Sequence, residues 1–292
     1  MTPMQNDSAG HAVPNSSGTA PPSLKAPANA ADCHIHIYDP RFAPPVEKPL
    51  NGTVEDYRLL QKRIGVTRVV IVTPRNYVTD NSVTLDAIRQ LGIADARGVA
   101  VIRPDISDAE LQRLHNGGIR GIRFTVGNPA SAVVSIDMIE PLAKRVAHFG
   151  WHVQLNMPAD KIVEHANMLQ RLPAAIVFDH MGKPPLPSGT RHRSHAVIRL
   201  LLDKERAWVK ISGAYMNTEI GPPTYADATA IAQTFVRAAP ERVVWGSDWP
   251  HPGPKEHPDD AVLFDLLAVC APDEAARNRI LVDNPKKLYG FS

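Results

Sequence analysis

Short apolar runs alternate with longer amphipathic stretches along most of the chain. Eight of these runs are rich in Val and Ile, and several are almost continuously apolar, as is typical of strands buried on both faces. They occupy residues 32–38, 68–74, 98–104, 121–127, 151–158, 175–182, 208–214 and 242–250. This pattern predicts eight strands of a parallel sheet.

The stretches between the runs carry the end signals of helices. Residues 53–65 begin with a Thr cap and end at a Gly, and residues 107–118 begin with a Ser cap and end at Gly-Gly. Residues 224–240 predict a third helix. Strands that alternate with helices imply right-handed crossovers, so eight such units predict an α/β fold, a closed (β/α)8 TIM barrel. An open doubly wound sheet is the competing fold, but no Gly-rich phosphate loop follows the first strand.

Length and charge narrow the class of protein further. The 292 residues suit one barrel domain, since single barrels commonly have about 250 residues. The net charge is +2, and basic and acidic residues are spread along the chain, so no basic face for nucleic acid is indicated. No apolar run reaches the roughly 18 residues that a membrane span needs. We therefore predict a small-molecule partner, with neither nucleic acid nor membrane.

The first 30 residues differ in composition from the rest. Residues 1–30 are rich in Ser, Ala, Pro, Asn and Gly and contain no apolar signal-peptide core. We expect a disordered or surface-draped tail there and a single catalytic domain over residues 31–292. Cys33 and Cys270 form no CxxC motif. They are predicted to be buried free thiols, which favours a reducing, cytoplasmic location.

Polar residues stand where the predicted strands end, which is where barrel enzymes place their chemistry. His34 and His36 lie two residues apart on the first strand and so share one face. Closure of the barrel pairs the eighth strand with the first and brings Asp248 beside them, and His180 reaches the same mouth from the sixth strand. Three histidines and a carboxylate are a metal-ligand set and equally an acid–base set. For any single one of these histidines, a structural place in the core is the alternative.

Further polar residues interrupt or follow neighbouring strands. Arg123 lies within the apolar fourth strand, Arg75 and Tyr77 follow the second, and Asn156 lies at the end of the fifth. Burying such groups is costly unless they are paired or used, so we assign them to substrate binding. For Arg123 and Arg75 a structural ion pair is the alternative, because buried Arg is normally paired.

Three motifs fall in order at the ends of the first, sixth and eighth predicted strands: "DCHIH", "FDHMGKP" and "WGSDWPHP". Together with the closing "NPKKLYGF", they resemble the amidohydrolase superfamily in its amidohydrolase-2 branch. The resemblance spans about residues 31–292 and implies a (β/α)8 barrel with His34, His36, His180 and Asp248 in the active site. Within the branch, the runs at 79–88 and 117–124 are similar to those of the 2-pyrone-4,6-dicarboxylate lactonases and the related D-galactarolactone isomerases.

The chain departs from the lactonase pattern around the predicted pocket. Residues 75–77 read Arg-Asn-Tyr where the lactonases have a Ser and a His, and Asn156 stands where they have a Tyr. The Arg residues that follow their fourth and seventh strands, and that hold a second carboxylate, are missing from residues 125–131 and 213–218. The departures therefore favour a ligand with one free carboxylate, held by Arg123, and with hydroxyls bound by amides.

The resemblance and the departures together imply a reaction. A sugar-diacid lactone carries one free carboxylate and several hydroxyls, so we predict an isomerase that converts D-galactaro-1,5-lactone to D-galactaro-1,4-lactone in galacturonate and galactarate catabolism. A sugar-acid or dicarboxylate lactonase of the same family, with or without a metal, is the alternative.

The resemblance also bears on metal binding. Many amidohydrolases bind one or two divalent ions, and a carboxylated Lys or a Glu typically bridges two. The fourth and fifth strands here offer Arg123 and Asn156, neither of which usually bridges two metal ions. We therefore predict a site with no metal and no cofactor, in which His34 and His36 form hydrogen bonds and transfer protons.

Overall fold

The computed structural model describes residues 12–42, 50–127, 133–254 and 256–292. Eight strands form one parallel sheet in chain order. Ile35, on the first strand, pairs with Trp249, which lies in the loop after the eighth strand. This pairing brings the two edges of the sheet together. The predicted (β/α)8 barrel is confirmed. The strands are β1 (Ala31–Ile35), β2 (Arg68–Val72), β3 (Ala96–Ala100), β4 (Ile119–Thr125), β5 (His152–Asn156), β6 (Ile176–Phe178), β7 (Ala207–Ile211) and β8 (Val243–Trp245).

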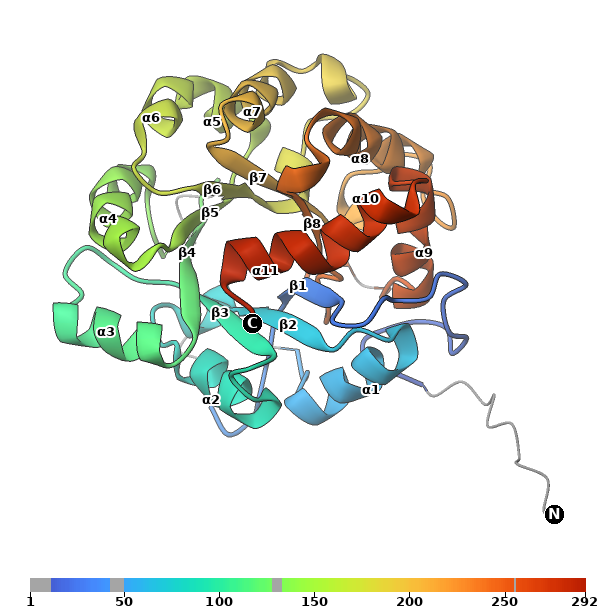
Figure 1. Ribbon diagram of the computed structural model, residues 1–292, viewed down its shortest axis with the longest axis horizontal. Helices are drawn as coiled ribbons and strands as arrows, with labels where there is room; N and C mark the ends of the chain where they lie inside the picture. The colour runs from blue at the N-terminus through green and yellow to red at the C-terminus, as the bar shows by residue number, and fades with distance from the viewer. Residues whose placement is uncertain (1–11, 43–49, 128–132, 255) are drawn as a thin grey trace.

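Helices surround the barrel (Figure 1). The first begins with a capping box, in which the Thr53 side chain accepts from the Asp56 N–H and the Asp56 carboxylate accepts from the Thr53 N–H. The three helices predicted from the sequence are confirmed as α1, α3 and α8, each shorter by one or two residues at either end. The α-helices are α1 (Val54–Ile64), α2 (Ser82–Leu91), α3 (Asp108–Asn116), α4 (Ile139–Val146), α5 (Ala159–Glu164), α6 (Ala166–Arg171), α7 (Arg193–Asp203), α8 (Ala226–Ala238), α9 (Asp260–Cys270), α10 (Glu274–Asn278) and α11 (Asn284–Tyr289).

Most strands are shorter than the apolar runs that predicted them. The run at 242–250 forms a strand only over Val243–Trp245, and the run at 175–182 only over Ile176–Phe178. Beyond these points the chain leaves the ladder and turns across the mouth of the barrel. His180 and Asp248 therefore lie on loops that follow the strands, not within them.

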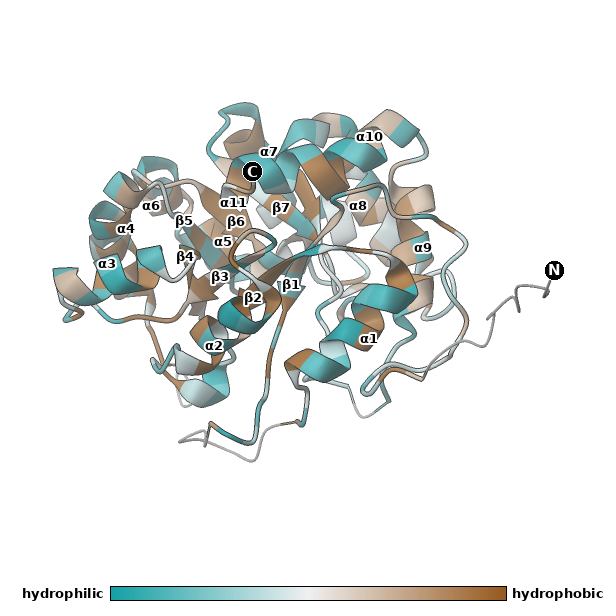
Figure 2. Ribbon diagram, turned by 60° about the horizontal axis from the view of Figure 1, so that its bottom comes forward, coloured by the Kyte–Doolittle hydropathy of each residue, from teal (hydrophilic) through white to brown (hydrophobic). Residues whose placement is uncertain are grey.

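Two clusters of buried side chains form the core. The smaller lies inside the barrel and includes Cys33, Val70 and Val177. The larger lies between strands and helices and includes Ile35 and Phe178. Figure 2 shows the apolar strands enclosed by helices that carry both polar and apolar residues. The pairing of β1 with β2 is irregular between Asp32 and Ile35, which accounts for Cys33 and His34 both contributing to the barrel interior.

The C-terminal residues close the end of the barrel at which the strands begin. Arg68, at the start of β2, donates to the Ser292 carbonyl over 2.6 Å. Arg97, near the start of β3, donates to the carbonyls of Tyr289 and Gly290. Figure 1 shows α11 running across this end. The chemistry of the barrel interior is thereby confined to the opposite, carboxyl end of the strands.

Residues 12–30 run along the barrel before β1. Val13 is buried, and the Pro14 carbonyl accepts from the Trp249 indole N–H over 2.8 Å. The N–H groups of Ser23 and Leu24 donate to Asp265 on α9. This segment therefore contacts the loop that carries Asp248. Residues 1–11 of the predicted tail lie outside the described residues, and among the described helices none is long and apolar enough to span a bilayer.

Candidate active site

Three side chains from β1 and the loop after β8 meet at the carboxyl end of the barrel. His34 Nε2 lies 3.3 Å from His36 Nε2. Asp248 Oδ1 lies 3.4 Å from His34 Nε2 and 3.7 Å from His36 Nε2. All three residues are buried. The proximity predicted from closure of the barrel is confirmed.

Backbone bonds hold these two segments together. The Asp248 N–H donates to the His34 carbonyl, and the His36 N–H donates to the Trp249 carbonyl, both over 2.8 Å. Gly246 allows this close approach, because a Cβ at that position would lie 2.6 Å from the His34 Cβ. Asp248 itself has a φ of 67°, a left-handed conformation that is uncommon outside Gly. The position of the carboxylate is therefore set by the backbone as well as by its side-chain partners.

His180 enters the site from a left-handed turn that follows β6. His180, Met181, Gly182 and Lys183 have φ values of 48°, 57°, 70° and 42°. This conformation costs roughly 1–2 kcal/mol for each non-Gly residue, so the surrounding contacts must maintain it. His180 Nδ1 lies 2.9 Å from the Ser212 hydroxyl, and His180 Nε2 lies 4.0 Å from Asp248 Oδ1. The turn thus aims the imidazole at the Asp248 carboxylate.

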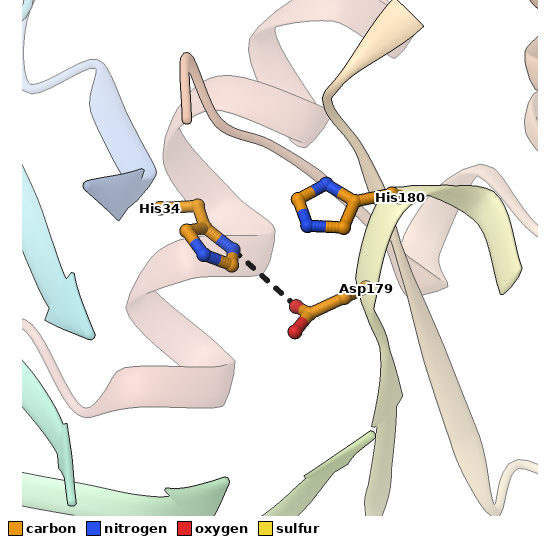
Figure 3. Close-up of side chains that lie close together, drawn as sticks. All are labelled: His34, Asp179 and His180. Carbon is orange, nitrogen blue, oxygen red and sulfur yellow. Dashed lines mark ion pairs between the residues drawn. The ribbon is translucent and has the colours of Figure 1, made fainter. Parts of the chain in front are cut away.

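A buried charged layer lies beside and below the histidines. Asp179 faces His34, with Oδ1 at 3.3 Å from His34 Nδ1 (Figure 3). Its Oδ2 accepts from Arg123 Nε over 3.0 Å and from Gln154 over 3.2 Å. The Lys210 ammonium donates to Gln154 Oε1 over 2.7 Å and lies 3.6 Å from Asp179 Oδ1. Arg123 therefore has the ion pair that was one of its two interpretations from the sequence.

Burial keeps the three histidines neutral. Burial, assisted by the charge of Arg123, lowers the pKa of His36 to about 4. Burial lowers the pKa of His180 to about 3, and burial and Lys210 hold the pKa of His34 well below its usual value. Neutral imidazoles at pH 7 have one N–H and one lone pair each, so the partners decide which nitrogen carries the proton.

The hydrogen-bond partners assign those protons consistently. His36 Nδ1 lies 2.8 Å from the Val72 carbonyl and must donate to it, so Nε2 of His36 is an acceptor. His34 Nε2, 3.3 Å away, then carries the proton that this acceptor receives. His34 Nδ1 in turn accepts from the Lys210 ammonium at 3.3 Å. In this arrangement the one N–H of His34 is directed at Nε2 of His36, and His34 itself has no exposed surface.

The two carboxylates of the site are shifted in opposite directions. Burial raises the pKa of Asp248, although His36 and the hydroxyl of Tyr215 both favour its ionised form. Burial also opposes ionisation of Asp179, but its contact with His34 and the charges of Arg123 and Lys210 outweigh burial and lower that pKa. Asp179 is thus a fixed anion, whereas Asp248 is the carboxylate suited to accept and return a proton.

A pocket of about 510 Å³ opens above these groups. Of the residues predicted to bind substrate, Arg75, Arg123 and Asn156 line it. Tyr77 does not line it, because its side chain is buried and packs against Tyr38 with ring centroids 6.3 Å apart. The direct contact predicted for Tyr77 is therefore not supported. The described lining consists of His36, Tyr38, Leu50, Pro74, Arg75, Asn76, Arg123, Thr125, Asn156, His180, Met216, Asp248, Pro252 and Gly253.

Two further residues that the sequence analysis did not assign reach the site from loops. Tyr215, in the short turn after β7, donates its hydroxyl to Asp248 Oδ2 over 2.5 Å. Lys183 donates its ammonium to the side-chain oxygen of Asn156. A tyrosine or a lysine on a loop gives no distinctive sequence signal. Lys183 follows the strand end that already carries His180, which is the one feature that points to it, and no such feature points to Tyr215.

A model of the family described as amidohydrolase matches residues 31–291. The chain belongs to this amidohydrolase family. It is 34% identical over 282 residues to a 2-pyrone-4,6-dicarboxylate hydrolase of Comamonas testosteroni, which covers 92% of each chain. It is 33% identical to a D-galactarolactone isomerase of Agrobacterium fabrum, which covers 94% of this chain and 96% of that one.

A solved structure shares the fold of this amidohydrolase along its whole length. The apo crystal structure of an Agrobacterium tumefaciens protein superposes with a TM-score of 0.85 and 30% sequence identity, covering 95% of this chain and 99% of that one. The barrel and the order of its elements are therefore those of the family.

Metal ions occur in the amidohydrolase superfamily, and the donor set here fits one divalent ion. Ligands about 2.1 Å from a tetrahedral ion lie about 3.4 Å apart, and His34 Nε2, His36 Nε2 and Asp248 Oδ1 are separated by 3.3 to 3.7 Å. Such an ion would need the Nε2 lone pair of His34. The proton of His34 would then lie on Nδ1, which would donate it to Asp179 Oδ1 at 3.3 Å. The metal-free site therefore stays a prediction from the sequence.

Proposed function

We propose that this protein is a lactone isomerase that converts D-galactaro-1,5-lactone to D-galactaro-1,4-lactone in sugar-acid catabolism. The observation that carries the proposal is the convergence of Asp248 Oδ1 with His34, His36 and His180 beside a pocket whose lining cations, Arg75 and Arg123, come from neighbouring segments. A proton-transfer group, donors for an oxyanion and a carboxylate anchor are the parts that acyl transfer within a sugar-acid lactone requires.

Similarity supports a lactone as the substrate. One relative is named a D-galactarolactone isomerase, and the other is named a hydrolase of 2-pyrone-4,6-dicarboxylate, which is also a lactone. The pocket favours the first substrate over the second. Beyond Arg75 and Arg123, the described lining of this pocket has no further Arg or Lys to hold a second carboxylate, and it includes the apolar Leu50, Met216 and Pro252.

In the proposed reaction the substrate supplies its own nucleophile. The 4-hydroxyl attacks the acyl carbon of the 1,5-lactone, and Asp248 Oδ1 accepts the hydroxyl proton. The resulting tetrahedral intermediate collapses, the ring oxygen leaves, and Asp248 returns the proton to it, so atoms and charge balance. Because the nucleophile is tethered, effective molarity supplies much of the acceleration, and the protein must chiefly select one conformer.

Two neutral histidines are assigned to the oxyanion. The Ser212 hydroxyl lies 2.9 Å from His180 Nδ1; where it donates to that nitrogen, Nε2 of His180 carries a proton that faces the pocket. The second donor is assigned to the Nε2–H of His34, which must leave Nε2 of His36 to reach the oxyanion, because His34 does not line the pocket. Donors fixed in a buried site stabilise developing negative charge without reorganisation, and one such donor contributes about 10²–10³ to kcat. His36, whose Nε2 is an acceptor, instead orients His34 or the attacking hydroxyl.

Arg123 and Asn156 are assigned to the rest of the substrate. The Nε of Arg123 is held by Asp179, which fixes the direction of the guanidinium, and its other nitrogens are available to a carboxylate. Arg75 lines the same part of the pocket. The amide of Asn156 is assigned to a hydroxyl oxygen. Tyr77, which does not line the pocket, is given no contact with the substrate in this scheme.

Lactone hydrolysis is the second candidate, and the 34% identity to a dicarboxylate hydrolase favours it. The same Asp248 and histidines would act, with a water in place of the 4-hydroxyl. A divalent ion held by His34, His36 and Asp248 would polarise the lactone carbonyl and stabilise the oxyanion.

One experiment separates these alternatives. EDTA-treated protein is incubated with freshly prepared D-galactaro-1,5-lactone, and the products are followed by NMR. Formation of the 1,4-lactone faster than in the blank supports the metal-free isomerase. Formation of open galactarate instead establishes a lactonase. Activity that appears only after addition of Zn²⁺ or Mn²⁺, with about one ion per chain, contradicts the metal-free mechanism.

A further inference from the structure

A second recess adjoins the catalytic pocket on the side of the cations. It has a volume of about 220 Å³ and shares Arg75, Arg123, Thr125 and Asn156 with the larger pocket. Lys183 completes its polar lining. The two spaces are therefore continuous around these four residues, and a ligand whose reacting carbonyl lies near Asp248 can extend into the recess.

The charged side chains in the described lining of the recess are all cations: Arg75, Arg123 and Lys183. The Asp179 carboxylate pairs with Arg123 Nε at 3.0 Å but also lies 3.6 Å from Lys210 Nζ, so Asp179 neutralises Arg123 only in part. Burial and the nearby charge of Arg123 lower the pKa of Lys183, in opposition to Asp179 and Asp248. An anion bound between Arg123 and Lys183 would relieve both penalties.

The ammonium of Lys183 is held in place by its surroundings. It donates to the side-chain oxygen of Asn156, and its backbone N–H donates to the His180 carbonyl over 3.0 Å. An ammonium has three donors, so its bond to Asn156 leaves two for a ligand. Asn156, with its oxygen occupied, offers an N–H to the same space. The left-handed turn thus supplies His180 to the reacting centre and Lys183 to the recess.

We propose that Lys183, held by Asn156, forms with Arg75 and Arg123 a subsite for the free carboxylate of the substrate, and that Lys183 restricts the enzyme to anionic lactones. This inference rests on the proposed action on lactones, and it adds the residue that selects anionic over neutral lactones. A carboxylate has only acceptors and carries the compensating charge, so it satisfies every donor of the recess. A hydroxymethyl group at the same position brings no charge to the buried Arg123 or the half-buried Lys183, so we expect a neutral aldonolactone to be rejected.

Substrates that differ only in this group provide the test. D-Galactaro-1,5-lactone and D-galactono-1,5-lactone share the ring and differ by a carboxylate against a hydroxymethyl group. We expect wild-type protein to prefer the anionic lactone in kcat/KM. Replacement of Lys183 by Met should reduce that preference about 10- to 100-fold, mainly through KM, because a hydrogen bond to a charged group is lost. Lys183→Arg should retain most of it, and the exposed control Lys161→Met should retain all of it.

Binding measurements separate this inference from the proposed reaction. Calorimetry with D-galactonate, an open-chain anion, and with galactitol, its neutral counterpart, requires no turnover. Anion binding that Lys183→Met weakens at least 10-fold supports the subsite even where no lactone is isomerised or hydrolysed. If both proteins turn over the lactones and the ratio of kcat/KM for the anionic over the neutral lactone is the same in Lys183→Met as in wild type, the subsite is overturned. The proposed function is then unaffected. Equal binding of D-galactonate to both proteins also overturns the subsite.

Discussion

The hydroxyl of Tyr215 donates to Oδ2 of Asp248 over 2.5 Å, while Oδ1 of the same carboxylate faces His34, His36 and His180. The two oxygens of Asp248 therefore have different tasks. Oδ2 is committed to the tyrosine, and Oδ1 is the atom left to exchange a proton with the substrate. On its far side, Tyr215 lies 3.2 Å from Nδ1 of the buried His251, so its hydroxyl is held from two directions.

Replacement of Tyr215 by Phe should impair the proposed base. The hydroxyl lowers the pKa of Asp248 by stabilising its ionised form, in opposition to burial. Without it the pKa of Asp248 rises further, and a larger fraction of the carboxyl is protonated at a given pH. The acidic limb of the pH profile of kcat/KM should therefore move to higher pH, and kcat at pH 7 should fall by about tenfold or more.

Another tyrosine outside the catalytic pocket provides the control for this change. Tyr225 lies on the loop before α8 and does not line the pocket around Asp248. Tyr225→Phe should leave the acidic limb where it is in wild type. If Tyr215→Phe gave a pH profile that overlays the wild-type profile, Asp248 would not be the group that titrates in the rate.

Replacement of His180 by Ala should cut kcat by about 10²–10³ if its Nε2–H stabilises the oxyanion. The change in KM should be small, because the donor acts mainly on the transition state. Ser212→Ala removes the hydroxyl that fixes the His180 ring, so it should give a smaller loss in the same direction. Steady-state kinetics with the lactone substrate measure both. A wild-type rate in His180→Ala would remove this histidine from the mechanism.

The barrel and the ring of strand-end residues could be predicted because they depend on repeated patterns. Eight apolar runs, alternating with capped helical stretches, specify the strand order, and closure then brings residues as distant as His34 and Asp248 together. The ends of the strands were predicted less well. Apolar side chains such as Trp249 and Met181 continue past the ladder into loops, where they are buried for packing, so hydrophobicity does not mark where pairing ends.

The residues that support the site were harder to predict for a physical reason. Lys183 and Tyr215 lie in short turns whose conformation, including the left-handed φ of Lys183, has no periodicity to read from the sequence. The position of Tyr77 outside the pocket lining has the same origin. Arg75–Tyr77 form a single tight turn, which directs Arg75 and Asn76 to the pocket and leaves the Tyr77 ring in the core.

A buried carboxyl outside the pocket should make stability depend on pH. Burial raises the pKa of Asp32 to about 7 from an ordinary value of 3.8, although Ser247 donates to both of its oxygens. Between these two pH values the folded chain binds more protons at Asp32 than the unfolded chain. The contribution of Asp32 to the free energy of unfolding therefore falls as pH rises through this window and levels off above about pH 7.

Replacement of Asp32 by Asn removes this pH-dependent contribution to the free energy of unfolding. Urea unfolding of both proteins at pH 4.5 and 7.5 should show the variant gaining about 3 kcal/mol relative to wild type at the higher pH. The exposed Asp105→Asn serves as the control and should follow wild type at both pH values. A difference between Asp32→Asn and wild type that is independent of pH would mean that Asp32 is ionised in the folded protein throughout this range.

Replacement of Gly246 by Ala should destabilise the barrel where β8 and the segment after it approach β1. The added Cβ would lie 2.6 Å from the His34 Cβ and 2.8 Å from the His34 nitrogen. His34 cannot retreat easily, because its carbonyl accepts from the Asp248 N–H over 2.8 Å. We expect the free energy of unfolding to fall by about 1–3 kcal/mol or more.

Gly253→Ala, which adds a Cβ with no atom within 4 Å, is the control and should change the free energy of unfolding by no more than about 0.5 kcal/mol. Denaturant unfolding of the two variants measures this contrast. Equal stability of Gly246→Ala and wild type would show that β1 and the loop carrying Asp248 can separate without loss, and the fixed geometry between His34 and Asp248 would then need another explanation.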